Sequence, residues 1–429
     1  MNKQKSLSVD DLISFIHEVW SYHRSLTGDG NRKTLLSIKK LIPDLSIQEI
    51  PTGTKFWDWE IPKEWNLKSA QIINESNEVI LDAKTCNLHV VSYSESIDKK
   101  LNLDELQERL HSIPELPDAI PYRTSYYEKN WGFCVTEDFR KTLKDSTYKV
   151  KIDSEFFNGS MTIGEIYLKG ETESEILFST YICHPMMANN ELSGPAMAIA
   201  LASYISSLDR YYSYRILFYP ETLGSLYFLS QNLTHLKKHL IAGYVLTCVG
   251  DENNWNFMPS RTGIAISDKI ALRILKKLNH NYNHNSFKSR GSDERQYCSP
   301  NIDLPVSSVM RSMYAQYPEY HTSKDDLNFI SKKGLSESLL LYKDIINEFE
   351  KNRIPKVTTF GEPMLSKRNL RNNVGGGLLS ENETLVSNIL AFSDGSNDLQ
   401  ELSLYLEVPL AEIINTVKLL IKFGLVKYL

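Results

Sequence analysis

The chain has 429 residues, enough for two or three domains, and its 41% hydrophobic and 24% charged residues are typical of a soluble globular protein. A formal net charge of −5 is small for this length, so the composition gives no sign of a nucleic-acid or polyanion partner. There is no signal-peptide pattern and no run of about 20 apolar residues, so we expect a cytoplasmic protein without membrane contact.

Five cysteines are spread along the chain without a CxxC pair. Neither a disulfide framework nor a cysteine zinc knot is therefore expected. Cys183 and Cys248 lie in apolar strand patterns, where a small buried side chain is favoured over a catalytic thiol.

The first 56 residues contain two helical patterns, at 9–26 and 31–42, followed by an extended segment. Residues 57–149 then change character, with short strands, prolines, tryptophans and tyrosines, and they predict an inserted β-rich domain. Its aromatic residues favour an aromatic core over a carbohydrate-stacking surface. An insert leaning over a neighbouring crevice would narrow access to it.

From residue 148 to 330, strand and helix patterns alternate, beginning with the strand YKVKI. Such alternation predicts a mostly parallel sheet covered by helices. We therefore predict a discontinuous α/β core formed by residues 1–56 and 150–355.

The C-terminal part begins with a polar segment at about 351–380, which includes NNVGGG and has the composition of a linker. Three helical patterns and a short strand follow, which predict a winged helix-turn-helix at 375–429. Its lysines are balanced by glutamates, as shown by Lys418, Lys422 and Lys427 against Glu401, Glu407 and Glu412. Without a basic recognition face we expect packing or homo-oligomer formation rather than DNA binding.

Histidines and carboxylates recur where predicted strands end. His184 follows the strand at 176–182, Glu221 follows the next strand, and His321 lies in the later loop PEYHTSKDDL. Ligands bind beyond the carboxyl ends of strands in open α/β sheets, and imidazole and carboxylate groups are zinc ligands. The pattern therefore predicts a zinc site in this crevice, whereas Asp251 after the third strand is expected to be an ordinary polar turn residue.

Four segments, YICHPMMANNELSGP, FYPETLGSLYFL, GSDERQYCSP and EYHTSKDDL, make the chain resemble a bacterial aminopeptidase-like family of three-domain proteins. The resemblance extends to RSLTGDG, WDWEIPKEW and PYRTSYYEKNWGFC, so it covers almost the whole chain. It implies a hydrolase-like zinc-exopeptidase core, an inserted β-rich domain and a C-terminal winged helix. Members are associated with surface-polysaccharide biosynthesis.

The wider di-zinc aminopeptidase superfamily implies roles for individual residues. His184 matches the first histidine ligand and His321 the last, while Glu221 matches the general base that acts on the metal-bound water. The implied reaction is hydrolysis of an amide or peptide bond in a small substrate.

The chain departs from that pattern at three positions. Asn189 stands where the bridging aspartate is expected, Thr222 replaces the second glutamate of the paired motif, and Thr247 or Cys248 replaces a strand-end aspartate. A neutral amide cannot compensate the charge between two Zn²⁺ ions as a carboxylate does. We therefore expect one zinc ion at most, held by His184, His321 and a carboxylate.

The third ligand has several candidates. Glu191 could complete the metal shell, or it could instead interact with the helix dipole. Asp293 or Glu294 could supply the oxygen, and Arg295 could bind a substrate carboxylate through two hydrogen bonds, although a loop salt bridge explains these three equally well. Asn189 and Tyr320 are further candidates for substrate contact.

Two rival interpretations accompany the zinc hydrolase. The altered positions would also suit a catalytically inactive ligand-binding or assembly protein on the same fold. A DNA-binding regulator using residues 381–429 would require a basic face, of which the sequence shows too little.

Overall fold

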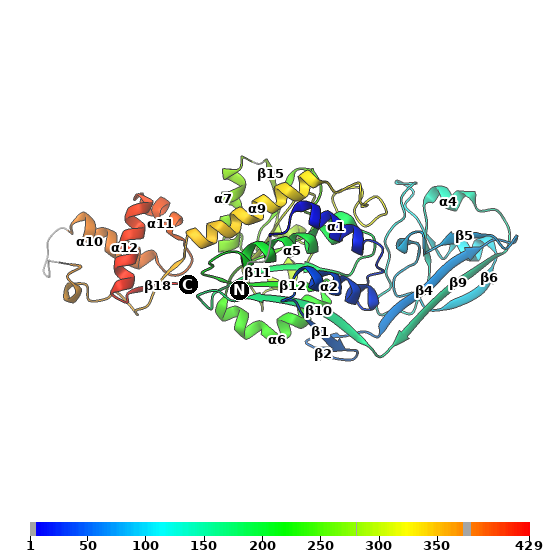
Figure 1. Cartoon of the computed structure of the whole chain (residues 1–429), viewed down its shortest axis with the longest axis horizontal. Coiled ribbons are helices and arrows are strands. Elements are labelled where there is room, and N and C mark those ends of the chain that lie inside the picture. The colour runs from blue at the N-terminus through cyan, green and yellow to red at the C-terminus, as the bar shows by residue number, and fades with distance from the viewer. Residues whose placement is uncertain (1–5, 280, 372–378) are drawn as a thin grey trace.

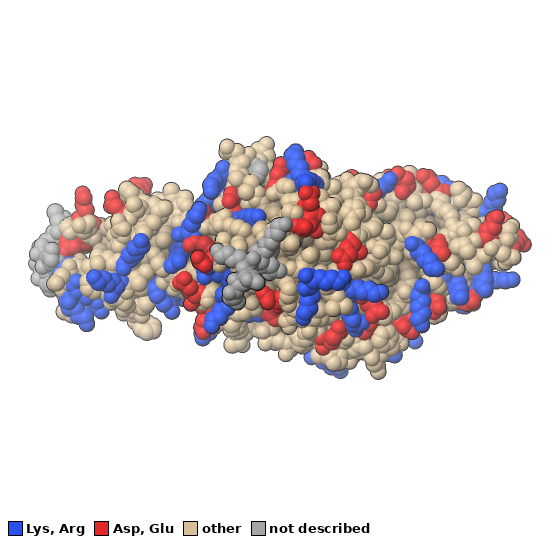
Figure 2. Space-filling view, viewed as in Figure 1, with Lys and Arg blue, Asp and Glu red and all other residues tan. Residues whose placement is uncertain are grey.

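The computed structural model describes residues 6–279, 281–371 and 379–429. The molecule is elongated, with a central helix-covered sheet, a second sheet at one end and a small helical unit at the other (Figure 1). Lys, Arg, Asp and Glu side chains are interspersed over the face shown in Figure 2. None of the helices in these ranges is long and apolar enough to cross a membrane, and all five cysteines are free.

The central sheet has eight strands in the order β1-β10-β12-β11-β13-β16-β14-β15. The strands are β1 (Ser46–Pro51), β10 (Ser160–Leu168), β11 (Glu175–Tyr181), β12 (Ser213–Tyr219), β13 (Leu240–Val245), β14 (Trp255–Met258), β15 (Tyr282–His284) and β16 (Val306–Met310). The four middle strands β12, β11, β13 and β16 are mutually parallel, whereas β10 runs antiparallel to β12 and β14 antiparallel to β16. At the edge, β1 pairs antiparallel with β10. The prediction of a mixed, mostly parallel α/β core is therefore confirmed.

Helices cover both faces of this sheet because its strands alternate buried apolar side chains between the two faces. Ile176 and Phe178 of β11 join one apolar core, and Leu177 between them joins the other. The helices of the core are α1 (Val9–Val19), α2 (Asp29–Leu41), the π-helical turn η2 (Ala188–Leu192), α5 (Ser193–Ser206), α6 (Leu223–His239), α7 (Ile266–Lys277), the 3₁₀ turn η3 (Phe287–Ser289), α8 (Glu294–Tyr297) and α9 (Lys332–Lys351). Helices α1, α2, α5, α7 and α9 contribute to the first core, and α6 and α8 to the second.

Helix α1 is shorter than the pattern at 9–26 predicts. It ends at Val19, and the Nη1 of Arg24 donates to the Val19 carbonyl at 2.6 Å. The buried guanidinium thus shares a carbonyl of the helix end with the backbone N–H of Tyr22, which donates to it at 3.1 Å. After Val19 the chain leaves the helix and enters the interior of the core, where Arg24 is buried.

The second sheet has four strands in the order β5-β4-β9-β6. The elements of this region are β2 (Lys55–Phe56), β3 (Trp59–Glu60), β4 (Glu64–Ile73), β5 (Val79–Asp82), η1 (Asn87–His89), β6 (Ile97–Leu101), α3 (Leu103–Gln107), β7 (Leu110–His111), β8 (Phe133–Cys134), α4 (Glu137–Thr142) and β9 (Tyr148–Phe157). Assigning YKVKI to the parallel sheet is wrong, because these residues belong to β9 and pair antiparallel with β4 and β6. Strand β9 leads directly into β10, so one pair of consecutive strands links the two sheets (Figure 1).

An ion cluster fastens the second sheet to the core. Arg32 on α2 donates to both oxygens of Glu64 at the start of β4, with the Nη2 to Oε2 distance at 2.7 Å, and to both oxygens of Glu49 on β1. The Glu64 side chain is 1% exposed, so its charge depends on this guanidinium for compensation. Burial raises the pKa of Glu49, but its hydrogen bonds from Arg32, Ser160 and Thr162 outweigh this and leave the pKa below its usual value.

The C-terminal unit is the predicted winged helix. It contains β17 (Pro355–Val357), η4 (Ser366–Arg368), α10 (Glu381–Phe392), α11 (Leu399–Leu406), α12 (Leu410–Lys422) and β18 (Val426–Tyr428), and β17 pairs antiparallel with β18. Its acidic residues face the core, since Arg273 of α7 lies 2.8 Å from Asp398 and Lys269 lies 3.3 Å from Glu401. The NNVGGG segment of the expected linker lies outside the described residues.

Replacing Arg32 with alanine should destabilise the protein by about 2–4 kcal/mol, because the buried Glu64 carboxylate loses its partner. Urea unfolding of Arg32→Ala measures this loss. Lys68→Ala, which removes the exposed pair with Glu155, is the matched control and should change stability far less than Arg32→Ala does. Equal effects of the two substitutions would contradict the role given to Arg32.

The lowered pKa of Glu175 predicts how the stability of the fold depends on pH. Burial raises its pKa, but hydrogen bonds from Arg215 and His235 outweigh burial and hold the pKa below its usual value. A lowered pKa in the folded state stabilises the fold above the unfolded pKa of about 4.5, and this stabilisation is lost as pH falls below it. The Tm of Glu175→Gln should therefore vary less than that of the wild type below about pH 4.5, and parallel curves would contradict this.

Candidate metal and substrate site

A cavity of about 300 Å³ lies beyond the carboxyl ends of β11 and β12. Its core walls are residues that follow these two strands and α1, together with Arg295 from α8. Trp59, Tyr122, Tyr126 and Tyr127 from the second-sheet region form the aromatic wall. The inserted region therefore does cover part of the crevice, and it makes the entrance aromatic.

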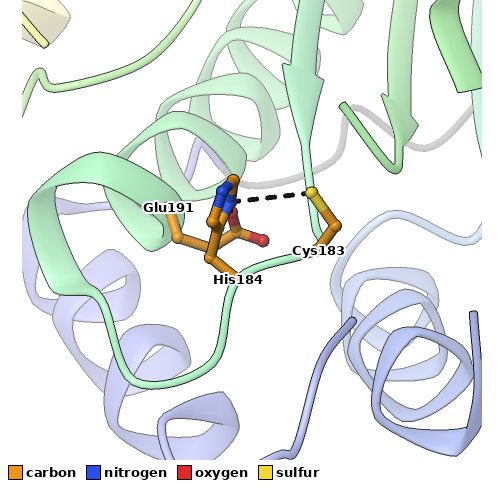
Figure 3. A group of neighbouring side chains, drawn as sticks. All are labelled: Cys183, His184 and Glu191. Atoms are coloured by element: carbon orange, nitrogen blue, oxygen red, sulfur yellow. Dashed lines mark hydrogen bonds and ion pairs between the residues drawn. The ribbon is translucent and has the colours of Figure 1, made fainter. Parts of the chain in front are cut away.

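His184 and Glu191 form the centre of this site (Figure 3). The Nδ1 of His184, on the loop after β11, lies 2.7 Å from Oε2 of Glu191, and both side chains are almost fully buried. Glu191 comes from η2, whose wide turn is closed by the hydrogen bond from Leu192 N to the Met187 carbonyl at 3.2 Å. This wider turn brings Glu191 toward His184, so the helical start does not turn it away.

Arg24 is a third member of this centre that sequence reasoning missed. Its Nε donates to the His184 carbonyl at 3.0 Å and lies 3.8 Å from Oε1 of Glu191. The side chain is fully buried. In the sequence it continues the first helical pattern, so no local signal separates it from a surface arginine.

Burial controls the protonation of this centre. It lowers the pKa of His184 to about 3, helped by the charge of Arg24, so the imidazole is neutral at physiological pH. Burial also raises the pKa of Glu191 to about 8, while the Arg24 charge opposes that rise. A neutral imidazole is the form of histidine that binds metal ions.

His321 faces His184 from another loop. The two ring centroids are 5.0 Å apart, and the Tyr122 ring packs edge-on against both imidazoles. The backbone N–H of Tyr122 donates to the His321 carbonyl at 2.8 Å, and Tyr320 stacks on His321 at 3.9 Å between centroids. Burial lowers the pKa of His321 well below its usual value. The two histidines of the predicted zinc site are therefore neighbours.

These residues include candidate ligands for a metal ion, but His321 is not among the ligand atoms that lie together. Ligand atoms of Cys183, His184 and Glu191 lie within 4.8 Å of one another, and Oε1 of Glu191 and Nε2 of His321 are buried without a hydrogen-bond partner. With Nδ1 of His184 bonded to Glu191, Nε2 is the ring nitrogen left for a ligand, an arrangement typical of metal-binding histidines. The adjacent positive charge of Arg24 disfavours a second cation.

Glu221 lies on the other side of the cavity. Its Oε1 accepts a hydrogen bond from Ser292 Oγ at 2.9 Å, and its backbone N–H donates to Cys183 Sγ at 3.2 Å. Burial, followed by the charge of Asp293, raises the pKa of Glu221 to about 8. Asp293 accepts from Thr222 N at 2.8 Å and Ser225 Oγ at 2.7 Å, so its carboxylate fixes the start of α6.

Arg295 lines the cavity beside Glu221. Its Nη2 donates to Thr222 Oγ1 at 2.7 Å, and its Nε is buried without a partner. Among the described residues no carboxylate lies within the 4 Å of an ion pair with this guanidinium. Arg295 therefore has free hydrogen-bonding capacity beside the cavity, and Thr222, where the superfamily has a glutamate, holds it there.

Six of the predicted site residues do not line the cavity, namely Glu191, Asp293, His321, Asn189, Glu294 and Tyr320. The amide of Asn189 donates to Asp251 at 2.7 Å and accepts from Gly250 N at 2.8 Å, so it holds loops together. Glu294 is buried and accepts from Gly291 N at 2.9 Å and from Tyr314 Oη at 2.5 Å. Tyr320 lies behind His321, as described above.

Asp325 is a second residue that the sequence reasoning missed. Its two oxygens accept the backbone N–H groups of Asn189 at 2.6 Å and Asn190 at 2.9 Å, at the first turn of η2. It therefore caps the turn that carries Glu191. The sequence signal that could have identified Asp325 is its position four residues after His321.

Two protein families and a bacterial relative match this chain. Residues 13–352 match the family described as "Domain of unknown function (DUF4910)", and residues 353–428 match a winged helix-turn-helix family. A protein of Clostridium acetobutylicum, named for polysaccharide biosynthesis and an aminopeptidase-like domain, is 44% identical over 399 residues, which are 92% of this chain and 90% of that protein.

Solved structures agree on the fold. A crystal structure described as a peptidase from Clostridium acetobutylicum has a TM-score of 0.82 and 41% identity, covering 98% of this chain and 96% of that chain. A zinc aminopeptidase from Bacillus subtilis has a TM-score of 0.56 at 15% identity, covering 80% and 94%. A peptidase M28 precursor from Shewanella amazonensis has a TM-score of 0.57 at 14% identity, covering 81% and 94%.

At such low identity the last two show the fold alone. Together the matches confirm the predicted resemblance to aminopeptidase-like proteins with a C-terminal winged helix, and the chain belongs to the DUF4910 family.

Proposed function

We propose that the protein is a hydrolase that uses one zinc ion to cleave an amide or peptide bond in a small substrate carrying a carboxylate. The observation that supports this most directly is the pairing of His184 with Glu191 next to His321, at a cavity that also contains Glu221. His184 and His321 would hold the ion. Glu191 would either complete its shell or orient His184, since carboxylates serve both purposes.

Each remaining residue has a chemical role in this proposal. Zinc, when bound, would polarise a carbonyl group and acidify a water molecule. Glu221 would accept a proton from the attacking water and pass it to the leaving amine. Arg295 would bind the substrate carboxylate through its free N–H groups, and the aromatic wall would exclude bulk water from the reacting bond.

The relative named for polysaccharide biosynthesis narrows the substrate class. An amide on an amino-sugar precursor would present an acyl group to Glu221 and the metal, and a sugar ring to the aromatic wall. Aromatic faces with polar edges suit such a ring.

A catalytically inactive ligand-binding protein is the second candidate. It is favoured by Arg24, whose charge already compensates Glu191 in part, and by Thr222, which replaces an acidic residue of the di-zinc enzymes. Metal content and turnover distinguish the two candidates.

The purified full-length protein should contain about one zinc per chain, because the buried neutral imidazoles have unpartnered nitrogens. His184→Ala and His321→Ala should lose the metal, and Glu191→Gln should weaken zinc affinity by about 10–100-fold. Elemental analysis and competition with a chromogenic chelator measure these effects. His284→Ala, an exposed histidine, is the control. A metal-free wild type, or unchanged metal content in folded His184→Ala and His321→Ala, would contradict the proposal.

Glu221→Gln should reduce kcat by about 10²–10⁴-fold while zinc content is retained, because the amide cannot accept the proton of water. A panel of aminoacyl, N-acyl-amino-sugar and N-acyl-amino-acid substrates measures this loss. The exposed Glu362→Gln is the control and should leave kcat unchanged. Absence of turnover in the zinc-loaded wild type across the panel, or full activity of Glu221→Gln, would favour the inactive binding protein.

A further inference from the structure

A second and larger hollow, of about 860 Å³, adjoins the metal-site cavity. We call it the aromatic groove, and its main residues are Tyr126, Tyr127, Phe156, Glu60, Lys63 and Asn158. It is formed by the β2–β3 hairpin, the loop that contains Tyr126 and Tyr127, and the end of β9. Its volume lies within the range of ligand sites, about 300–1,000 Å³.

The groove and the cavity share two lining residues. Tyr126 and Tyr127 line both of them. Tyr127 is held in place because its Oη donates to the Glu60 carbonyl at 2.7 Å, which joins its loop to the β2–β3 hairpin. A ligand lying in the groove would therefore contact the same two tyrosines that line the cavity beside His184 and Glu221.

Several aromatic faces of the groove are exposed to solvent. The side chains of Tyr126, Tyr127 and Phe156 are 48%, 54% and 38% exposed, and Trp59 at the shared entrance is 38% exposed. By contrast, Trp65 and Tyr93 stack on each other in the interior at 5.5 Å between centroids. The aromatic residues of the insert therefore divide into a buried core and a surface set. Clustered exposed apolar groups are typical of binding sites.

The polar rim of the groove indicates the type of ligand. It carries three carboxylates, Glu60, Glu95 and Glu128, and two ammonium groups, Lys63 and Lys129. Hydroxyl groups both donate and accept, so a mixture of carboxylate, ammonium and amide groups can bind them. A polyanion would meet more negative than positive charge, and a purely apolar ligand would leave these polar groups unpaired.

We propose that the aromatic groove binds the sugar rings of a neutral oligosaccharide or glycosyl substituent, with the rings packed on Tyr126, Tyr127 and Phe156. Saccharide binding stands on the groove alone. The further step, that the bound saccharide presents an attached acyl-amino group to Glu221 and the metal, depends on the proposed function. The groove thus extends the substrate class from a small amide to a glycosylated one.

Isothermal titration calorimetry of the full-length protein tests the binding. The probes are chitotetraose and maltotetraose as neutral saccharides, a hyaluronan tetrasaccharide as an anionic one, and tetra-alanine as a peptide. We expect at least one neutral saccharide to bind more tightly than the anionic saccharide and the peptide. Tyr127→Ala and Phe156→Ala should each weaken that binding by about tenfold. Tyr405→Ala, which removes an exposed aromatic residue of α11, is the matched control and should leave affinity unchanged.

The outcomes separate this inference from the hydrolase proposal. Glu221→Gln should bind the neutral saccharide as tightly as the wild type does, even though it should lose turnover. Tighter binding of the peptide or the anionic saccharide, no binding of either neutral saccharide, or equal affinity in Tyr127→Ala and Phe156→Ala would overturn the inference. None of these results depends on whether the protein hydrolyses an amide.

Discussion

The hydrogen bond between the buried side chains of His184 (Nδ1) and Glu191 (Oε2) is the constraint on which the site depends. It forms only because η2 begins as a wide π-helical turn, and that turn is capped by both oxygens of Asp325. The same region needs close approach of the backbone, since a side chain at Gly194 would meet the Leu246 carbonyl at 2.3 Å. Strand β11, the turn η2 and helix α5 are therefore arranged so that His184 and Glu191 meet, which an ordinary α-helical start would not achieve.

Charged and polar partners surround this pair. The Arg24 guanidinium stands 3.8 Å from Glu191. The amide of Asn189 is bonded to Asp251 and Gly250. In the proposed hydrolase, the buried positive charge of Arg24 would favour a single divalent ion over two.

Sequence reasoning succeeded where local patterns coincide with tertiary structure. The apolar strand ending at His184, the alternation of strands and helices, and the three helices of the winged helix all follow from periodicity, and the motif resemblance identified the aminopeptidase-like fold. Arg24 could not be found in this way, because its helix pattern continues past the point where burial of the guanidinium ends the helix. The place of Asn189 also depends on Asp251 and Gly250, which are far away in sequence and which no spacing rule contains.

For the inserted region, the structure adds information that the sequence pattern left open. Its aromatic content allowed either a core or a carbohydrate surface, and the structure divides these residues, with Trp65 and Tyr93 buried and Tyr126 and Tyr127 exposed. The separation is physical: Arg32 and Glu64 fix the base of the insert to the core, and the Tyr122–His321 backbone bond fixes its far loop beside the metal-site residues. The insert is held at both ends, and its exposed Tyr126 and Tyr127 lie at the cavity. Tyr126 and Tyr127 line the same cavity as His184 and Glu221, so in the proposed hydrolase one loop of the insert would contact a substrate bound in the core.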